Sequence, residues 1–398
     1  MTIRIPLSAP DIRDAEIDAV TAVLRTDRLS LGPELEAFEQ AVAAYHSIPD
    51  AVAVSSGTAG LHLALLALGV GEGAEVIVPS FAFVAVANAV VQVRATPVFV
   101  DIDPVTLNLA PALVEEAITP RTRAILVVHT FGVPAEMGRL QEIARRHNLA
   151  LIEDACEAIG AEYDSRKAGS FGDLAVLGFY PNKQITTGEG GCVLVRNPEL
   201  ADRLRSLRNQ GRASKHRDDD VKEFEKGDLV ASWFEHAEIG YNYRLSELAA
   251  ALGRVQLGRI DEILAMRRAA AERYQSLLET ISDLELPPLA LPRRSISWFV
   301  YVVRLPDGPA DATGDSSFRD RVQVQLARRG IATGRYFAPI HQQPAWYGHP
   351  SAVAAKVPIT ETIARRTLAL PFFNRIMPAQ QEEVAAALSL TIQECKRY

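Results

Sequence analysis

The sequence predicts an α/β protein whose large domain holds a mostly parallel, mixed sheet flanked by helices. Short apolar segments alternate with helical patterns through the first half of the chain, which is typical of parallel sheets covered on both faces. The pattern becomes less regular after about residue 250 and there predicts a smaller α+β domain. A chain of 398 residues is long enough for about two domains, for which we expect bounds of 1–250 and 251–398.

In the first domain, each expected strand is a short apolar run, and each expected helix has apolar residues at helical spacing. Strands are expected at 51–54, 75–79, 96–100, 124–128, 149–152, 174–177 and 192–195. Helices are expected at 12–24, 34–45, 59–69, 84–91, 111–118, 137–147 and 155–160. Gly69 supports one of these ends, because glycine commonly follows the last turn of a helix.

The second domain begins within a long expected helix, whose apolar stripe runs from Leu248 to Leu277 at spacings of mostly three and four. A strand at 297–304, a loop rich in Pro, Gly and Asp at 306–316 and a helix at 318–329 follow. Two closing helices are expected at 360–370 and 379–395.

Composition excludes several classes of protein. The formal charge of 42 − 49 = −7 argues against a general nucleic-acid binder. No apolar run is long enough to span a bilayer, and the first residues lack the pattern of a signal peptide. The three cysteines, Cys156, Cys192 and Cys395, are too scattered for a disulfide framework or a zinc site. We therefore expect a soluble cytoplasmic protein with no membrane partner.

Lys183 lies between two expected strands, behind aromatic and apolar residues and ahead of a turn with three glycines. A lysine enclosed in dry, positively charged surroundings becomes an amine nucleophile that can form Schiff bases. A solvated lysine on a hairpin is the alternative. The choice depends on what the rest of the chain places beside it.

Three further candidates follow expected strands. Gly57 and Thr58 begin a helix directly after a strand, where free N–H groups and the helix dipole favour a phosphate; an ordinary N-cap is the alternative. Phe83 could be core or could offer a flat face to a planar ring. Asp154 could cap a helix or could face a protonated ring nitrogen.

These residues are expected to share one edge of the sheet, because ligands bind at the carboxyl ends of parallel strands. His129 follows another strand and is expected on the same edge. The basic segment 203–217, which contains Arg212, could bind a phosphorylated substrate or could be a solvated face.

A planar cofactor with a phosphate, a ring nitrogen and an aldehyde would use every element on this edge. That cofactor is pyridoxal phosphate. A dinucleotide is set aside, because no Gly-x-Gly-x-x-Gly motif lies between a first strand and helix.

The motifs that carry a family resemblance are spread over nearly the whole chain and occur in the family's order. They are Arg28 with Gly32-Pro33, Ser56-Gly57-Thr58-Ala59, 79–83 (PSFAF), Glu153-Asp154-Ala155, Gly169 with Gly172-Asp173, Lys183 with 187–191 (TGEGG), 240–244 (GYNYR) and Pro339-Ile340-His341. On these residues the sequence resembles the DegT/DnrJ/StrS family of sugar aminotransferases, within the fold type I superfamily of aspartate aminotransferase.

The resemblance implies a role for each matching cofactor residue. Lys183 corresponds to the lysine that forms the Schiff base and moves protons, and Asp154 to the partner of the pyridine nitrogen. Gly57 and Thr58 correspond to phosphate-binding residues, and Phe83 to the aromatic residue that stacks on the cofactor.

The resemblance also implies a partner subunit and a substrate site. Asn242 corresponds to an asparagine that reaches the cofactor phosphate of the neighbouring subunit, which implies a homodimer with shared active sites. His341 lies in a segment that lines the sugar site in the family. Arg212 and Tyr241 are further candidates for substrate binding.

Two positions depart from the common family pattern. Gly178 stands where many members have a phosphate-binding serine. Glu157 stands where many have a glutamine beside the cofactor, as in some members that resemble perosamine synthase. A branch with histidine in place of the lysine dehydrates sugars, and Lys183 argues against it.

The function that these inferences predict is transfer of an amino group from a donor such as glutamate to a keto sugar carried on a nucleoside diphosphate. A cyclitol ketone is the alternative substrate. A regulatory homologue that binds the cofactor without turnover is an alternative from another functional class. The simplest alternative is an α/β protein without a cofactor site, in which these residues are helix caps and core residues.

Overall fold

The structure is a computed structural model that describes residues 2–212, 236–306 and 317–397. Its centre is a seven-stranded sheet in the order β1 (Asp50–Val54), β9 (Gly191–Val195), β8 (Leu174–Gly178), β5 (Ala150–Asp154), β4 (Thr122–Val128), β2 (Glu75–Pro79), β3 (Thr96–Val100). Only β9 runs antiparallel to its neighbours β1 and β8. All other pairs are parallel, so the predicted mostly parallel, mixed sheet is confirmed.

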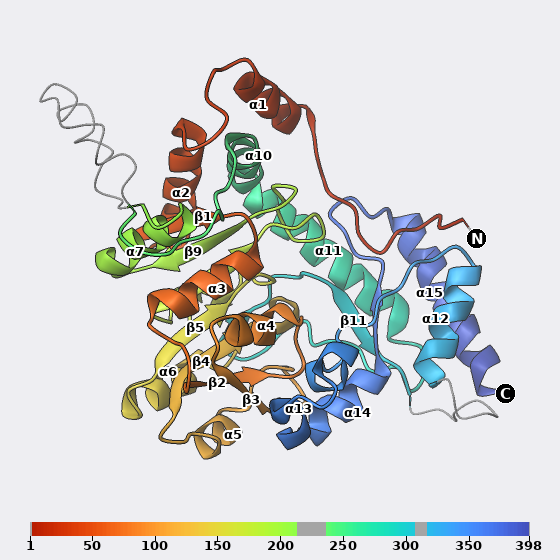
Figure 1. Ribbon diagram of the computed structural model, residues 1–398. Helices are drawn as coiled ribbons and strands as arrows, with labels where there is room; N and C mark the ends of the chain where they lie inside the picture. The colour runs from red at the N-terminus through yellow and green to blue at the C-terminus, as the bar shows by residue number, and fades with distance from the viewer. Residues whose placement is uncertain (1, 213–235, 307–316, 398) are drawn as a thin grey trace, which may run out of the picture.

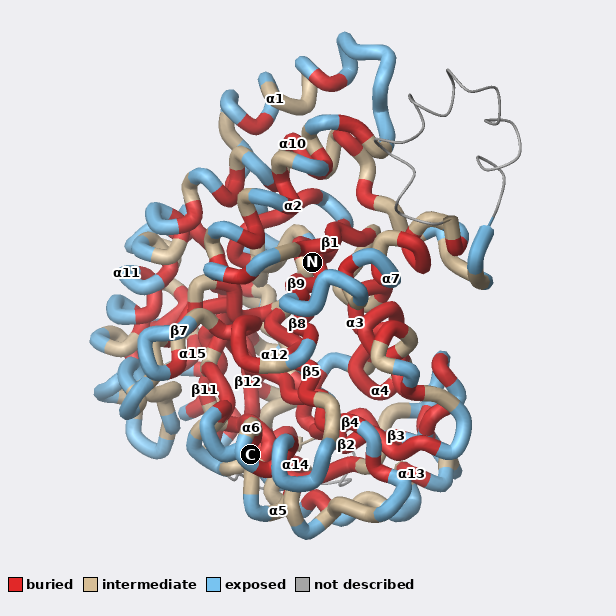
Figure 2. The backbone as a smooth tube through the Cα atoms, turned by 90° about the vertical axis from the view of Figure 1, so that its left-hand side faces the viewer, coloured by how far each residue is buried: buried red, intermediate tan, exposed pale blue. Residues whose placement is uncertain are grey.

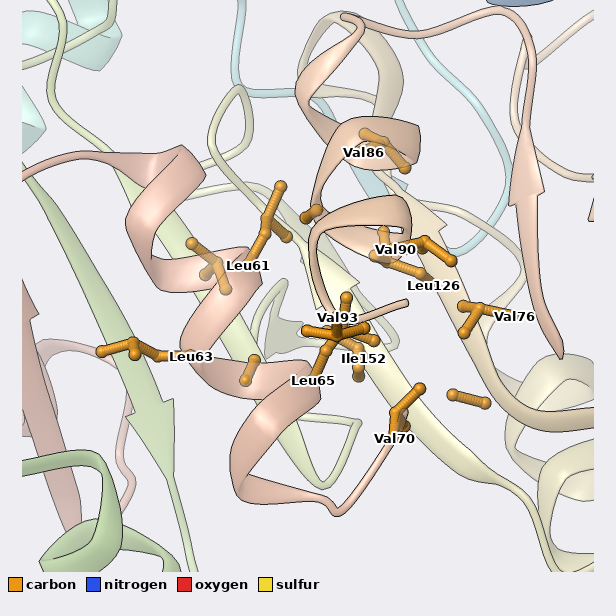
Figure 3. Packing of buried hydrophobic residues seen from close by; sticks show 14 of the residues in the cluster. Leu61, Leu63, Leu65, Val70, Val76, Val86, Val90, Val93, Leu126 and Ile152 are labelled. Atoms are coloured by element: carbon orange, nitrogen blue, oxygen red, sulfur yellow. The ribbon is translucent and has the colours of Figure 1, made fainter. Parts of the chain in front are cut away.

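Helices cover both faces of this sheet (Figure 1). On one face lie α3 (Gly57–Ala67), α4 (Ala85–Gln92) and α7 (Pro198–Arg208), which share an apolar core with the strands. Figure 3 shows Leu65 of α3 and Val90 of α4 close to Leu126 and Ile152 of the sheet. A sheet covered on both faces needs strands that are apolar throughout, and the central strands are buried along almost their full length (Figure 2).

The other face is covered by α5 (Pro111–Glu116) and α6 (Met137–Arg146) and, near β1 and β9, by α2 (Pro33–Tyr45) and α10 (Glu247–Gly258). The N-terminal helix α1 (Asp14–Leu24) packs on α10. A single 3₁₀ turn, η1 (Thr130–Gly132), follows β4. The strand at 75–79 and the strand at 96–100 have the bounds that the sequence predicts.

The C-terminal part has its own apolar core. The antiparallel pair β11 (Tyr301–Arg304) and β12 (Thr367–Leu370) packs with α11 (Ile260–Leu278), α12 (Phe318–Arg328) and α15 (Pro378–Lys396). Between these elements lie η2 (Ile340–Gln342), η3 (Pro344–Trp346), α13 (Pro350–Ala354) and α14 (Pro358–Arg366). The predicted domain boundary at residue 250 stays a prediction. No helix of the described ranges is both long and apolar enough to cross a membrane.

Three expected helices differ from the structure. Residues 155–160 form successive tight turns, with bonds from Ala158 N–H to Ala155 and from Ala161 N–H to Ala158. The long helix is divided at Arg259, whose backbone is not helical. The expected helix 360–370 ends at Arg366, because the next four residues pair with β11.

Short strands were not expected from the sequence. β6 (Glu162–Tyr163) pairs with β7 (Arg166–Lys167) and with β10 (Arg294–Ser295). Two-residue strands carry too little periodicity for detection, and the pairing of β10 with β6 joins segments more than a hundred residues apart in the chain.

The buried carboxylate of Glu153 fixes the end of β5. It accepts backbone N–H groups from Gly169, Phe171 and Gly172 at 2.8, 2.7 and 2.7 Å, and it lies 2.9 Å from His129 Nε2. Burial alone would raise the pKa of Glu153, but these hydrogen bonds outweigh burial and hold the pKa below its ordinary value. The carboxylate therefore ties the 169–172 loop to the sheet in its ionised form.

We expect Glu153→Gln to destabilise the protein by about 3 kcal/mol in urea unfolding at neutral pH, because an amide cannot satisfy the same set of donors. Glu162→Gln is the matched control: its side chain is 37% exposed and pairs with Lys167, so its loss should cost less than about 1 kcal/mol. The carboxylate contributes fully above the ordinary pKa of a glutamate, and its contribution is lost as pH falls through the lowered pKa. The difference between wild type and Glu153→Gln should therefore shrink in acid, and a constant difference would contradict this account.

Candidate active site

A cavity of about 450 Å³ opens at the carboxyl ends of the central strands. Its walls come from the start of α3, the ends of β4, β5 and β8, and the C-terminal half of the chain. Six predicted cofactor residues line it together: Gly57, Thr58, Phe83, Asp154, Glu157 and Lys183. The common edge expected from the parallel strands is therefore present.

Lys183 lies in the irregular segment between β8 and β9, and its N–H donates to the carbonyl of Tyr180 in a tight turn. Its side chain is only 15% exposed. The Nζ atom lies 4.0 Å from the centre of the Phe299 ring and 3.5 Å from Glu157 Oε1. The amine is thus enclosed by an aromatic face and a carboxylate. This enclosure excludes the alternative of a solvated lysine on a hairpin.

Gly191 shows why glycines follow this lysine. A Cβ atom at this position would lie 2.6 Å from the carbonyl carbon of Ser56 and 2.7 Å from Gly57 N. Only a residue without a side chain lets β9 approach the start of α3 so closely. The glycine therefore brings the lysine segment and the first turn of this helix to one cavity.

The sequence allowed two interpretations of the first turn of α3, an ordinary N-cap and a phosphate site, and the structure is compatible with both. Ser56 is an N-cap, whose Oγ accepts the N–H of Ala59 at 3.0 Å. Gly57 and Thr58 follow it and line the cavity. A Cβ on Gly57 would lie 2.8 Å from Cys156 Sγ, so the close packing of Cys156 requires glycine there.

Cys156 also gives a structural reason for Gly178. A Cβ on Gly178 would lie 3.1 Å from both Cβ and Sγ of Cys156, which is tighter than ordinary contact. A serine at position 178 would need Cys156 to move. The thiol thus takes the space beside the helix start that a side chain at 178 would occupy.

Asp154 and Glu157 are two buried carboxylates on the cavity wall. Asp154 ends β5, and its Oδ1 accepts the N–H of Cys156 at 3.0 Å, so it orders the turn while it faces the cavity. Glu157 Oε2 accepts the N–H of Phe131 at 2.9 Å. Burial raises the pKa of Glu157, and the nearby Lys183 ammonium and this N–H oppose the rise.

His129 follows β4 at this edge, as expected, but its side chain does not line the cavity. Its side chain is fully buried, between Glu153 and the N–H of Ala135, which donates to Nδ1 at 3.1 Å. Since Nδ1 is an acceptor, the proton is on Nε2 and faces Glu153. Alternate residues of a strand point to opposite faces: Val128 and Asp154 line the cavity, whereas His129 and Glu153 face the other way.

Four predicted residues do not line this cavity in the described part of one chain. Asn242 is exposed and forms a backbone bridge with Asn209. Tyr241 stacks on Tyr243 with ring centres 5.1 Å apart. Arg212 is the last described residue before a gap, and residues 213–217 of the basic segment lie outside the described ranges. The roles of Asn242, Tyr241 and Arg212 stay predictions.

His341 is the fourth. Its Nδ1 lies 2.7 Å from Ser80 Oγ, and its Nε2 lies 3.1 Å from Glu361 Oε1. The side chain is only 7% exposed. These contacts hold the C-terminal segment against the end of β2, and the predicted contact of His341 with a sugar stays a prediction.

Sequence reasoning missed the residues that the C-terminal half contributes to the cavity, chiefly Phe299 and Tyr336. Phe299 lies in an apolar segment and looks like an ordinary core residue. Tyr336 lies near the Pro339-Ile340-His341 motif, which was the one available signal. Its hydroxyl is 3.5 Å from Asn182 Nδ2, beside Lys183.

The chain also matches known proteins along nearly its full length. The model of the DegT/DnrJ/EryC1/StrS aminotransferase family matches residues 10–389. GDP-perosamine synthase of Caulobacter vibrioides is 40% identical over 97% of both chains. The dTDP-3-amino-3,4,6-trideoxy-alpha-D-glucose transaminase of Streptomyces venezuelae is 41% identical over 90% of this chain and 87% of its own.

A solved structure supports the same assignment. DesV of S. venezuelae, in complex with a ketimine intermediate, superposes with a TM-score of 0.84 at 37% identity, over 98% of this chain and 99% of DesV. The family resemblance and the fold type I architecture are thereby confirmed. The chain belongs to the DegT/DnrJ/EryC1/StrS aminotransferase family.

Proposed function

We propose that this pyridoxal-phosphate-dependent aminotransferase transfers an amino group from an amino acid, with glutamate as the expected donor, to the ketone of a nucleotide-linked sugar. The observation that carries the proposal is Lys183, enclosed in one cavity with Asp154 and the first turn of α3. The names of two relatives support the substrate class, since one acts on a GDP-linked and the other on a dTDP-linked sugar.

The residues present fit the cofactor. The first turn of α3 at Gly57 and Thr58 offers N–H groups and a positive dipole end to a phosphate. Phe83 borders the cavity, and 61% of its surface is exposed. Its ring is therefore accessible to a planar ligand that would pack on it. Asn182 Oδ1 is buried, and the described residues supply it with no hydrogen-bond partner. The volume suits a small-molecule site.

When bound, pyridoxal phosphate supplies an aldehyde for Schiff-base formation and a ring that accepts electrons. The Lys183 amine provides the nucleophile, and its Nζ atom takes and returns protons. The Asp154 carboxylate favours a positive charge on a group that faces it. The rings of Phe299 and Tyr336 exclude water from the lysine side of the cavity.

We expect the protein supplied with pyridoxal phosphate to show a visible absorbance distinct from that of the free cofactor, and Lys183→Ala to lose it. Borohydride reduction followed by peptide mapping should place the cofactor on Lys183. Lys167→Ala is the matched control, because Lys167 pairs with Glu162 outside the cavity. An unchanged spectrum in Lys183→Ala would refute the assignment.

A substrate panel tests the proposed acceptor. Enzyme converted to its amine form with glutamate should recover the visible absorbance on addition of a nucleotide-linked 3-keto or 4-keto sugar. Recovery with free inosose but no nucleotide sugar would instead favour the cyclitol alternative. Failure with every amino donor would favour a regulatory homologue.

The proposal includes a homodimer with shared active sites. Asn242 lies outside the cavity of its own chain, as a residue that serves a partner's site would. Exposed apolar side chains on the α1 region and near Asn242 provide a surface to bury: Ile17, Leu24, Leu29 and Ile239. A cytoplasmic location stays a prediction, with which three free thiols agree.

Mixing variants tests the sharing of sites. Lys183→Ala and Asn242→Ala should each lose most activity, whereas a mixture refolded together should regain part of it, because half of the mixed dimers' sites would combine intact residues. A mixture that stays inactive while sedimenting as a dimer would contradict shared sites.

A further inference from the structure

Two residues from distant parts of the chain, Glu157 and Phe299, lie beside the Lys183 ammonium. The Phe299 ring faces Nζ at 4.0 Å, and Glu157 Oε1 lies 3.5 Å away. Both groups attract a cation, and the attraction to a ring is stronger where water is excluded. The side chain of Lys183 is 15% exposed, and that of Glu157 is 8% exposed.

A buried arginine holds the backbone on both sides of the Trp298–Phe299 peptide bond. Arg267 of α11 is 2% exposed, and its guanidinium donates to the carbonyls of Trp298 and Phe299 at 2.5 and 2.6 Å. It also donates to Asn374 Oδ1. A planar guanidinium with three fixed acceptors holds this backbone in one place, and the ring that faces Lys183 is held with it.

Gln184, which follows Lys183 in the chain, connects the backbone of Glu157 to the segment that precedes Phe299. The Gln184 amide donates to the carbonyls of Glu157 and Ser297 at 2.7 and 3.1 Å. The Phe131 N–H fixes the other carboxylate oxygen of Glu157. The lysine segment, the Glu157 turns and the Phe299 segment are therefore joined by one set of hydrogen bonds.

We propose that Phe299 and Glu157 form an ammonium cradle that holds Lys183 whenever its amine is not bonded to the cofactor. This inference rests on the proposed function, since the cradle serves the half of the reaction in which the cofactor carries the amino group. The lysine is free in the empty protein and in the form with pyridoxamine phosphate. It leaves the cradle only when it bonds pyridoxal phosphate, so the cradle favours the pyridoxamine form over the pyridoxal form.

The test compares the affinities of the protein for the two cofactor forms, measured by equilibrium dialysis. In Phe299→Leu we expect the preference for pyridoxal phosphate over pyridoxamine phosphate to rise by about tenfold, which lies between the values for an exposed and a desolvated cation–π contact. The change should come from tighter binding of pyridoxal phosphate. Loss of a merely structural residue would weaken both cofactors.

A double-mutant cycle shows whether the effect passes through the lysine. In a Lys183→Ala background, Phe299→Leu should leave the ratio of affinities unchanged. Phe299→Tyr keeps an aromatic face and should match wild type. Phe81→Leu is the packing control, because Phe81 is buried and does not line the cavity. Glu157→Gln should move the ratio in the same direction and serves as the test if Phe299→Leu does not fold.

Each outcome is decisive. An unchanged ratio in Phe299→Leu or Glu157→Gln, or an equal shift with and without Lys183, would overturn the cradle and leave the proposed function standing. A wild-type protein that binds neither cofactor would refute the proposed function instead.

Discussion

The hydrogen bonds of the buried Glu153 carboxylate hold the end of β5 and the following loop in one position, and the site depends on this position. Glu153 and Asp154 are adjacent and point to opposite faces of the sheet. One carboxylate is fully consumed by backbone donors and His129, while its neighbour faces the cavity. Because successive side chains of a strand alternate between faces, two adjacent acidic residues have different surroundings: Glu153 is bonded inside the fold, and Asp154 lines the cavity.

The cavity is composite. The first half of the chain supplies the helix start at Gly57, the exposed ring of Phe83 and the lysine itself, all at the carboxyl edge of the sheet. The C-terminal half supplies Phe299 and Tyr336, which cover the lysine from the other side. The Gln184 side chain joins the two halves by donating to the Ser297 carbonyl, and Arg267 holds the backbone of Phe299 within the C-terminal half. Lys183, Asp154 and Gly57 come from motifs that are local in the sequence, but the residues that enclose them come from distant segments.

The structure gives a physical reason for one departure from the common family pattern, Gly178, and a consequence for the other, Glu157. Gly178 leaves room for Cys156, which also packs against Gly57. A glutamate at position 157 brings a second carboxylate to the cavity, where it pairs with Lys183 and accepts the Phe131 N–H. Burial of such a group is tolerated because both oxygens have partners. The pair gives the lysine a defined place in the absence of a ligand.

The sequence was enough to predict the strands, most of the helices and most of the residues that gather at the sheet edge, because strand and helix periodicity and the turn glycines are local signals. The strand order depends on pairing between distant segments. The sequence also indicated Lys183 and Asp154 through motifs in family order. Residues 367–370 form a strand because they pair with β11, and His129 faces Glu153 because β4 lies beside β5; neither contact could be found from local sequence. The same holds for Phe299, which precedes β11 because the strand expected at 297–304 begins only at Tyr301. An apolar residue in an apolar segment does not indicate a function until the fold places Lys183 Nζ 4.0 Å from the centre of its ring.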